Sequence, residues 1–169
     1  MIEMELVGVR VELPANQPIV LLKERDGSRF LPIWIGAVEA TAIAFALQGV
    51  ETPRPLTHDL FVDVLQALDV ELVAVHITEL SDGTFYAELK LLRAGEPATV
   101  SARPSDAIAL ASRLGEVPIL AAPGVMDEAG LEIEDDEDGA SSSTGDDEEE
   151  VRQFRAFLDE VTPEDFKEQ

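Results

Sequence analysis

The chain has 169 residues, no cysteine and a formal net charge of −23, with 35 acidic residues against 12 basic ones. The lack of cysteine excludes disulfides, thiolate metal sites and cysteine nucleophiles. The acidic excess argues against tight, extended binding of nucleic acid, because contacts to many phosphates normally need a basic stripe.

The first 35 residues predict a strand followed by a β-hairpin. Residues 1–13 alternate apolar and polar side chains without a basic leader, which indicates a strand and not a signal peptide. Two apolar runs follow at 19–24 and 29–35. They flank Asp26-Gly27, a dipeptide that favours a type I′ hairpin turn.

Residues 34–68 predict two helices joined by a short loop. In the first helix, small and apolar residues recur at helical spacing, and Glu39 is the only charged side chain before the glycine at position 49. Gly49 is expected to end this helix, because glycine readily takes the left-handed conformation found just past a helix end. A carboxylate that points inward needs a partner, for which Arg54 and Arg103 are the candidates.

The second helix is expected to begin with Thr57 as its N-cap. Asp59 then falls in the first turn, where a negative charge meets the positive end of the helix dipole. The apolar spacing predicts a buried stripe formed by Leu60, Val64 and Leu68.

A second hairpin is predicted at 71–93, with its turn at Asp82-Gly83. The alternation in its first strand predicts one buried face, formed by Val73, Val75 and Ile77. A short strand near 99–102 and a helix that ends at Gly115 follow.

A last short strand is expected at 118–120. The order of strands, two helices, strands and helix predicts an α+β fold, with a mixed, largely antiparallel sheet and three helices. We expect this domain to span residues 1–133.

The composition changes after the domain. Residues 134–150 place acidic blocks around a Ser/Gly segment and predict an acidic, disordered linker. Residues 151–169 return to helical spacing and predict a short, C-terminal amphipathic helix.

Residues 127–169 hold 18 acidic and 3 basic residues, a net charge of −15, whereas residues 1–126 hold 17 and 9, a net charge of −8. The domain is therefore acidic even without its tail.

Two helix entrances repeat one local design, in which an arginine and a proline precede a hydroxyl residue and an aspartate. An arginine beside the free N–H groups of a helix start is a ready anion site. We therefore predict a phosphate-binding role for Arg54, Thr57, Arg103 and Ser105. Helix capping alone is the alternative explanation for the hydroxyl residues and for Asp106.

These motifs resemble those of the bifunctional nuclease domain family, over about residues 1–133. The shared short motifs, in order, are Ile35-Gly36, Glu39-Ala40, Ala42-Ile43, Arg54-Pro55-Leu56-Thr57-His58-Asp59-Leu60 and Arg103-Pro104-Ser105-Asp106-Ala107-Ile108-Ala109-Leu110. The resemblance implies a small α+β domain that, in some members, degrades both RNA and DNA.

The catalytic interpretation gives roles to Glu39, His58, Asp59 and Asp106. His58 would move a proton as general base or acid. The three carboxylates, Glu39, Asp59 and Asp106, would hold one or two Mg²⁺ or Mn²⁺ ions, since these ions prefer oxygen ligands.

The alternative is a non-catalytic, oligomeric binding or regulatory module. In that case the helix–loop–helix is an interface and the polar residues form a structural salt-bridge network. We further expect weak or transient contact with nucleic acid and a homo-oligomer, most simply a dimer. No apolar run approaches the ~20 residues of a membrane span, so we predict no membrane association and a cytoplasmic location.

Overall fold

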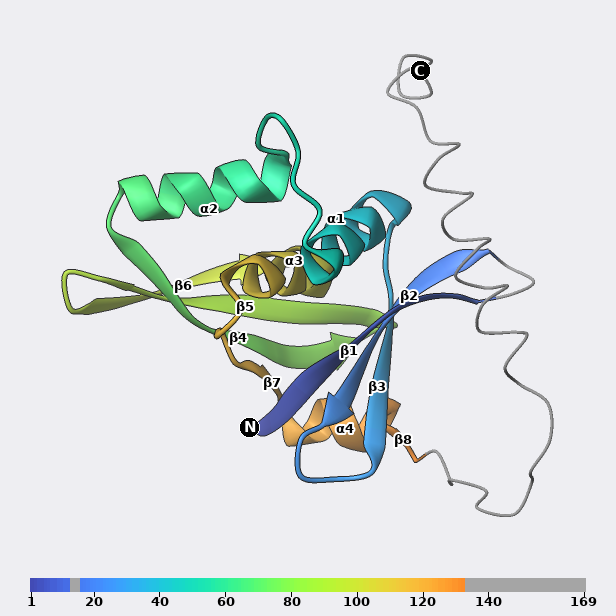
Figure 1. Cartoon of the computed structure of the whole chain (residues 1–169). Coiled ribbons are helices and arrows are strands. Elements are labelled where there is room, and N and C mark those ends of the chain that lie inside the picture. Colours follow the sequence, from blue (N-terminus) through green and yellow to red (C-terminus); the bar gives the residue numbers. More distant parts are fainter. Residues whose placement is uncertain (13–15, 133–169) are drawn as a thin grey trace. The chain divides into compact units, whose positions relative to one another are not determined.

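One eight-stranded sheet forms the framework of the computed structural model, which describes residues 1–12 and 16–132 (Figure 1). Along the sheet the strands lie in the order β6-β5-β4-β7-β1-β2-β3-β8. Only β4 and β7 pair in parallel, so the predicted mixed, largely antiparallel sheet is confirmed for the described residues. The strands are β1 (Ile2–Glu12), β2 (Gln17–Glu24), β3 (Arg29–Trp34), β4 (Val70–Ser81), β5 (Thr84–Arg93), β6 (Glu96–Ala102), β7 (Ile119–Ala121) and β8 (Leu131–Glu132).

Four helices lie on the described part of the sheet, namely α1 (Ala37–Gln48), α2 (Thr57–Ala67), α3 (Pro104–Leu114) and α4 (Pro123–Ala129). Figure 1 shows α1, α2 and α3 on one side of the sheet and α4 on the other. The α+β class is confirmed, although the sequence predicted three helices and missed α4. With seven residues, α4 is too short to show a helical period.

Helix α3 lies at the centre of the helical side and packs against α1, α2, β4 and β5. Its alanines allow this close approach, because small side chains let neighbouring elements come near on several sides at once. The largest fully buried side chains of the core are Leu22, Leu31, Ile43, Ile77, Ile108 and Met126.

Both predicted hairpins form, but only one has the predicted turn. Asp82 and Gly83 have φ angles of 49° and 73°, as a type I′ turn requires. The link between β2 and β3 is longer, and Gly27 has no positive φ, so the type I′ turn predicted there is wrong. A Cβ at Gly27 would overlap the Glu24 carboxylate, which binds Arg29. A larger residue at position 27 would therefore require the Glu24 carboxylate to shift.

The predicted buried face of β4 is wrong at one position. Val73 is exposed, because a β-bulge lies between Leu72 and Ala74 in the pairing with β5. An extra residue shifts the alternation by one. Leu72, Val75 and Ile77 are the residues that enter the core.

Helix α2 contradicts two predictions. Its N-cap is Leu56, in extended conformation, so Thr57 is the first helical residue and not the cap. The stripe predicted to be buried, Leu60, Val64 and Leu68, is exposed. The helix buries Val62 and Leu65 instead. Apolar residues occupy more than one face of α2, and periodicity alone cannot say which face meets the domain.

Residues 1–133 and 134–169 are separate units of the chain. The predicted linker (134–150) and the predicted C-terminal helix (151–169) lie outside the described residues and remain predictions. Among the helices that the structure describes, none is long and apolar enough to cross a membrane.

Candidate active site

The three carboxylates predicted for the site occupy the same position in three different helices. Gly36, Leu56 and Arg103 are the N-caps of α1, α2 and α3. The third residue after each cap is an acid, which complements the positive end of the helix dipole. These residues are Glu39, Asp59 and Asp106.

Arg103 joins the starts of α1 and α3. Its Nη2 donates to Glu39 Oε1 at 2.7 Å and to Asp106 Oδ1 at 3.1 Å. Its Nε donates to Asp106 Oδ2 at 2.7 Å, so the ion pair between Arg103 and Asp106 is bidentate. The Arg103 side chain is nevertheless 66% exposed, so its remaining donors face solvent.

His58 adds the start of α2 to this group. Its Nε2 lies 3.1 Å from Asp106 Oδ1, and its side chain is 13% exposed. His58 Nδ1 makes no hydrogen bond to the described residues. Every fully buried side-chain nitrogen or oxygen of the described residues has a hydrogen-bond partner, so Nδ1 is not fully buried. Nδ1 must therefore keep contact with solvent. With the ring proton on Nε2, the Nδ1 lone pair can accept a proton.

We call the four residues Glu39, His58, Arg103 and Asp106 the Arg103 cluster. Burial alone would raise the pKa of Asp106, but hydrogen bonds from Arg103 and His58 outweigh it and hold that pKa below its usual range. The hydrogen bond to Asp106 in turn raises the pKa of Arg103. Both groups are therefore charged near neutral pH.

Asp59 belongs to a different network, centred on Arg113 of α3. Arg113 Nε donates to Asp59 Oδ1 at 2.5 Å, and Nη1 donates to the backbone oxygens of Ala42 and Ala109 at 3.1 and 2.9 Å. Asp59 Oδ2 accepts from the Leu56 N–H at 2.8 Å. The Arg113 side chain is 9% exposed. Its guanidinium thus connects α1, α2 and α3.

This network gives Asp59 a structural role that the sequence did not reveal. Burial raises the pKa of Asp59, but Arg113 and the Leu56 N–H outweigh burial and lower the pKa. Arg113 was not predicted as a site residue. Its only signal in the sequence is that it is the one basic residue in the last turn of α3.

Gly36 is a second residue near the site that was not predicted from the sequence as a site residue. A Cβ at this position would overlap Glu39 Oε2, because the Glu39 side chain folds back over its own N-cap. With a side chain at position 36, the Glu39 carboxylate would have to shift from this place. The Ile35-Gly36 motif thus supports the placement of Glu39 beside Arg103.

Three of the four predicted phosphate-binding residues lie outside the cluster. Arg54 is exposed and forms no ion pair with the described residues, and Thr57 is exposed at the start of α2. Ser105 is buried in α3, with 6% of the residue exposed. Arg103 is the member of this set that lies beside predicted catalytic residues.

The predicted metal ligands do not converge on one point. Within residues 1–12 and 16–132, no group of three histidine, aspartate or glutamate side chains is arranged to hold a metal ion. Glu39 and Asp106 both bind Arg103, whereas Asp59 binds Arg113. As they are placed, Glu39, Asp59 and Asp106 do not surround a single Mg²⁺ or Mn²⁺ ion. The metal dependence expected from the sequence stays a prediction.

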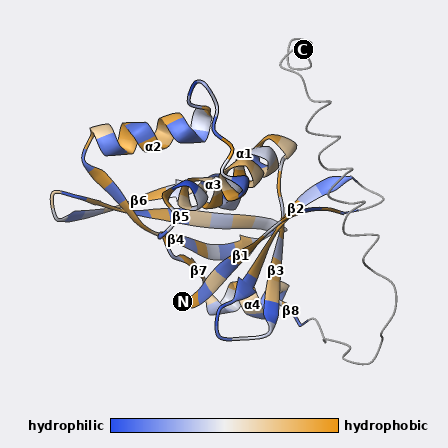
Figure 2. Cartoon of the chain, in the orientation of Figure 1, coloured by the Kyte–Doolittle hydropathy of each residue, from blue (hydrophilic) through white to orange (hydrophobic). Residues whose placement is uncertain are grey.

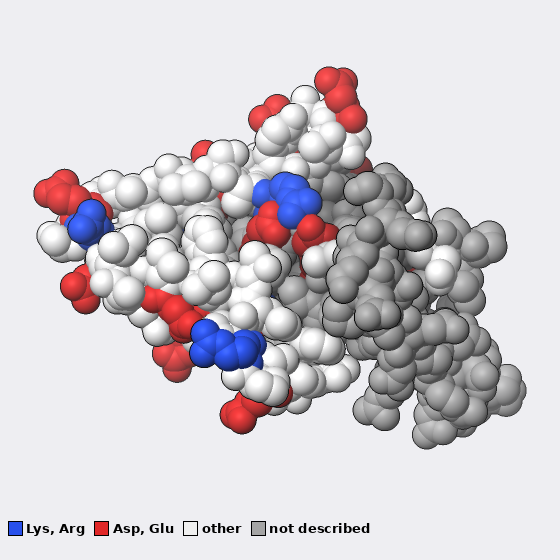
Figure 3. Space-filling view, turned by 90° about the horizontal axis from the view of Figure 1, so that it is seen from above, with Lys and Arg blue, Asp and Glu red and all other residues white. Residues whose placement is uncertain are grey.

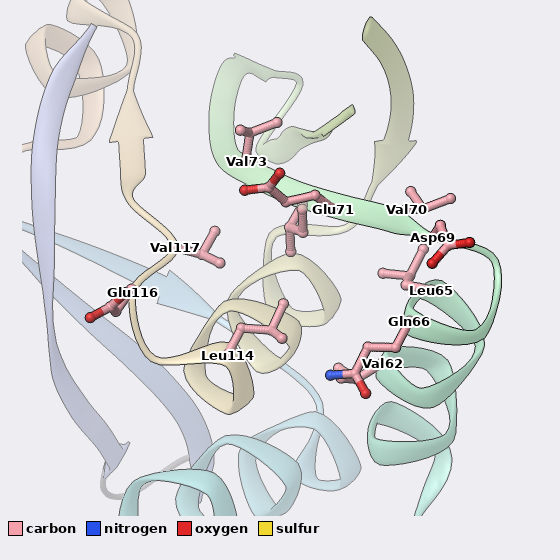
Figure 4. A pocket seen from close by; sticks show the side chains of 11 residues that line it. Val62, Leu65, Gln66, Asp69, Val70, Glu71, Val73, Leu114, Glu116 and Val117 are labelled. Atoms are coloured by element: carbon pink, nitrogen blue, oxygen red, sulfur yellow. The ribbon is translucent and has the colours of Figure 1, made fainter. Parts of the chain in front are cut away.

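The structure also contains a groove that is distinct from the cluster. It lies between the end of α2, the start of β4 and the link from α3 to β7 (Figure 4). Val62, Leu65 and Val117 are among its apolar lining, and Asp69, Glu71 and Glu116 are its acidic residues. None of the residues predicted for catalysis or phosphate binding lines it.

Fold and site together define an α+β domain with an arginine-centred charged cluster at the starts of three helices. The family model described as the bifunctional nuclease domain matches residues 20–134. The chain therefore belongs to the bifunctional nuclease domain family, as its motifs predicted.

Two kinds of relative accompany this family match. An uncharacterized protein of Mycobacterium tuberculosis is 52% identical over 165 residues, which cover 98% of each chain. Bifunctional nuclease 1 of Oryza sativa is 30% identical over 115 residues, 66% of this chain and 34% of the rice protein. Bifunctional nuclease 1 of Arabidopsis thaliana is 28% identical over 109 residues, 62% of this chain and 33% of the plant protein. The chain thus matches about a third of the length of the plant nucleases.

Proposed function

We propose that the chain is a nuclease that hydrolyses phosphodiester bonds of RNA, DNA or both at the Arg103 cluster. Membership of the bifunctional nuclease domain family supports the reaction class. The proposed position of the active site is based on one observation: His58 and Arg103 both contact the carboxylate of Asp106. A proton acceptor and an anion-binding group are thereby held next to each other.

Arg103 would bind a phosphate oxygen of the substrate. Its Nε and Nη2 are occupied by carboxylates, whereas Nη1 has no hydrogen-bond partner among the described residues. A guanidinium with free N–H groups in a fixed orientation suits phosphate. Glu39 and Asp106 would hold the guanidinium in place, which limits the entropy lost on binding.

His58 would act as the general base. In the proposed step, Nδ1 takes a proton from a water molecule, whose oxygen attacks phosphorus as the bond to the leaving ribose oxygen breaks. Asp106 stabilises the imidazolium that forms, and the leaving oxygen takes up a proton from solvent. A water nucleophile would serve RNA and DNA alike, because it does not depend on the ribose 2′-hydroxyl.

Binding of nucleic acid would be weak or transient. The chain is strongly acidic, and five of the nine basic side chains in the described residues are already in ion pairs. Little positive charge is left to track a phosphate backbone. The proposed substrate contact is therefore local to the Arg103 cluster.

Divalent-metal dependence, a homo-oligomeric state, most simply a dimer, and a cytoplasmic location remain parts of the proposal. Because Glu39 and Asp106 are engaged by Arg103, no step of the mechanism above runs through a metal ion. Comparison of turnover with EDTA and with added Mg²⁺ or Mn²⁺ tests the metal dependence directly.

A second candidate function is a non-catalytic binding or regulatory module. The ion pairs from Arg103 to Glu39 and Asp106, and from Arg113 to Asp59, favour it, because they fit a structural salt-bridge network. In that case neither His58 nor Arg103 would affect any turnover of nucleic acid.

The proposal is tested with Arg103→Gln in a hydrolysis assay on single-stranded RNA and DNA. We expect KM to rise and kcat/KM to fall about 10- to 100-fold, since the charged phosphate contact is lost. Arg93→Gln, at the exposed end of β5, is the matched control. Equal kcat/KM for wild type and both variants would assign the function to the binding module instead.

A further inference from the structure

The single tryptophan of the chain lies at the end of β3 and is exposed to solvent. Trp34 is the last residue of this strand, and 53% of it is exposed. Leu31 and Ile33 of the same strand are buried in the core, so the alternation of the strand turns Trp34 to the opposite side. Exposure alone would not mark a site, because single apolar residues on a surface are common. The orientation and the position of Trp34 distinguish it.

The indole ring of Trp34 is anchored at one edge. Its Nε1 donates to Glu12 Oε2, at the end of β1, at 3.1 Å. This nitrogen is the only hydrogen-bond donor of the indole, so the ring needs no other polar contact. Among the described residues, Lys23 is the cation that lies over an aromatic ring, 5.4 Å from the centre of Phe30, and none lies over Trp34. The exposed part of the indole is therefore oriented by its anchored edge and open for stacking.

The chain itself places Trp34 close to the Arg103 cluster. Consecutive Cα atoms are 3.8 Å apart, so the Cα atoms of Trp34 and Gly36 are within about 8 Å of each other. The Glu39 carboxylate occupies the place that a Cβ of Gly36 would take. Glu39 Oε1 in turn accepts from Arg103 Nη2 at 2.7 Å. The indole and the guanidinium that is proposed to bind phosphate thus lie at the same end of α1.

The surface offers little positive charge to hold a nucleic-acid strand at this place. On the described part of the face in Figure 3, the lysines and arginines lie beside acids and form no continuous stripe. Helix α1, into which Trp34 leads, has Glu39 as its one charged residue and is otherwise mostly hydrophobic (Figure 2). Affinity for a strand bound at Arg103 must therefore come from contacts that need no charge. Stacking of a base on an aromatic side chain is such a contact.

We propose that Trp34 is a stacking platform for an unpaired base of the substrate, next to the phosphate that Arg103 binds. This inference rests on the proposed nuclease function and restricts its substrate to single-stranded nucleic acid. In a duplex the faces of each base are covered by its neighbours, whereas the bases of a single strand can be splayed out and stacked on a protein side chain. Every base has an aromatic face, and stacking does not involve the sugar, so RNA and DNA suit this platform equally.

The fluorescence of Trp34 reports this contact directly, because the chain has no other tryptophan. The full-length protein is titrated with single-stranded oligothymidylate of ~10 nucleotides, a length within the range that single-strand sites cover. A phosphorothioate backbone slows cleavage during the titration. Stacking of a base on the indole should quench its emission to saturation. A duplex of the same length, and a strand of abasic sites that keeps the phosphates and lacks the bases, should leave the emission unchanged.

Three variants then separate stacking from other effects, with affinity measured from the anisotropy of a labelled strand and folding checked by circular dichroism. Trp34→Leu should weaken binding about 5- to 100-fold, as expected when a stacking aromatic residue is removed, and should raise KM with little change in kcat. Trp34→Phe keeps an aromatic face and should stay within about 5-fold of wild type. Phe30→Leu is the matched control, because it removes a ring of the same strand that Lys23 already covers. It should bind as wild type does.

Failure of this inference is distinguishable from failure of the proposed function. Unchanged emission at saturating strand, equal affinity of Trp34→Leu and wild type, or equal binding of the abasic strand would each overturn the stacking role. Turnover by the wild-type protein would still leave the nuclease standing in those cases. Base-dependent quenching without any turnover would overturn the nuclease and support Trp34 as part of a surface that binds single strands.

Discussion

His58 Nε2 lies 3.1 Å from Asp106 Oδ1, although 48 positions separate the two residues in the chain. The contact brings the first turn of α2 to the first turn of α3, where Arg103 binds the same carboxylate. A histidine, a carboxylate and an exposed guanidinium therefore share one small region. In the proposed mechanism, this arrangement would allow proton transfer next to a phosphate held by Arg103.

Arg113→Met should destabilise the fold by about 2–3 kcal/mol, because it leaves the Asp59 carboxylate and the Ala42 backbone oxygen without their buried donor. Chemical denaturation at neutral pH measures the change. Arg93→Met removes an exposed arginine and should stay within about 0.5 kcal/mol of wild type. Equal stability of the two variants would show that the Arg113 network contributes nothing.

Acid should remove the contribution of Asp106 to stability. Its pKa is lower in the folded chain than in the unfolded chain, so its ionised form is favoured by folding. That contribution is complete above about pH 4 and is lost as pH falls through the lowered pKa. Asp106→Asn should therefore differ most from wild type at pH 6 to 7, and the difference should shrink below pH 4. A gap in unfolding free energy that is independent of pH would contradict this expectation.

Glu39→Gln separates a structural role from a ligand role. Glu39 accepts a charged hydrogen bond from Arg103 at 2.7 Å, and the arginine side chain is largely exposed. Loss of the charge should cost about 0.5–1 kcal/mol and lower Tm by a few degrees. We expect KM to rise modestly while kcat stays within about 10-fold of wild type. Abolished turnover with an unchanged Tm would identify Glu39 as a reacting or metal-binding group.

Most of the fold could be predicted from local patterns. The alternation of 84–93 and the Asp82-Gly83 turn define a hairpin without help from distant residues, and the structure confirms both. Local patterns fail where tertiary packing decides between two faces. Val73 is displaced by a bulge, and α2 turns its Leu60 side outward because Val62 and Leu65 meet the domain instead.

The candidate site could be predicted as a set of residues but not as a geometry. Nothing in the sequence says that Asp106 meets His58 while Asp59 meets Arg113, since both aspartates hold the same position in their helices. The division follows from how α2 lies across α3. The same packing brings Arg113, which belongs to none of the motifs, against Asp59. It leaves Arg54 outside the cluster.

The most direct test of the account is nuclease turnover by His58→Ala beside His76→Ala, under single-turnover conditions with a purified protein. The chain has two histidines, and His76 lies on β4 and forms no hydrogen bond or ion pair with the Arg103 cluster, which makes it a matched control. We expect His58→Ala to hydrolyse single-stranded nucleic acid roughly 10²- to 10⁴-fold more slowly than wild type, with unchanged circular dichroism, and His76→Ala to retain the wild-type rate. Wild-type turnover by His58→Ala would contradict the assignment of the general base and of the active site around it.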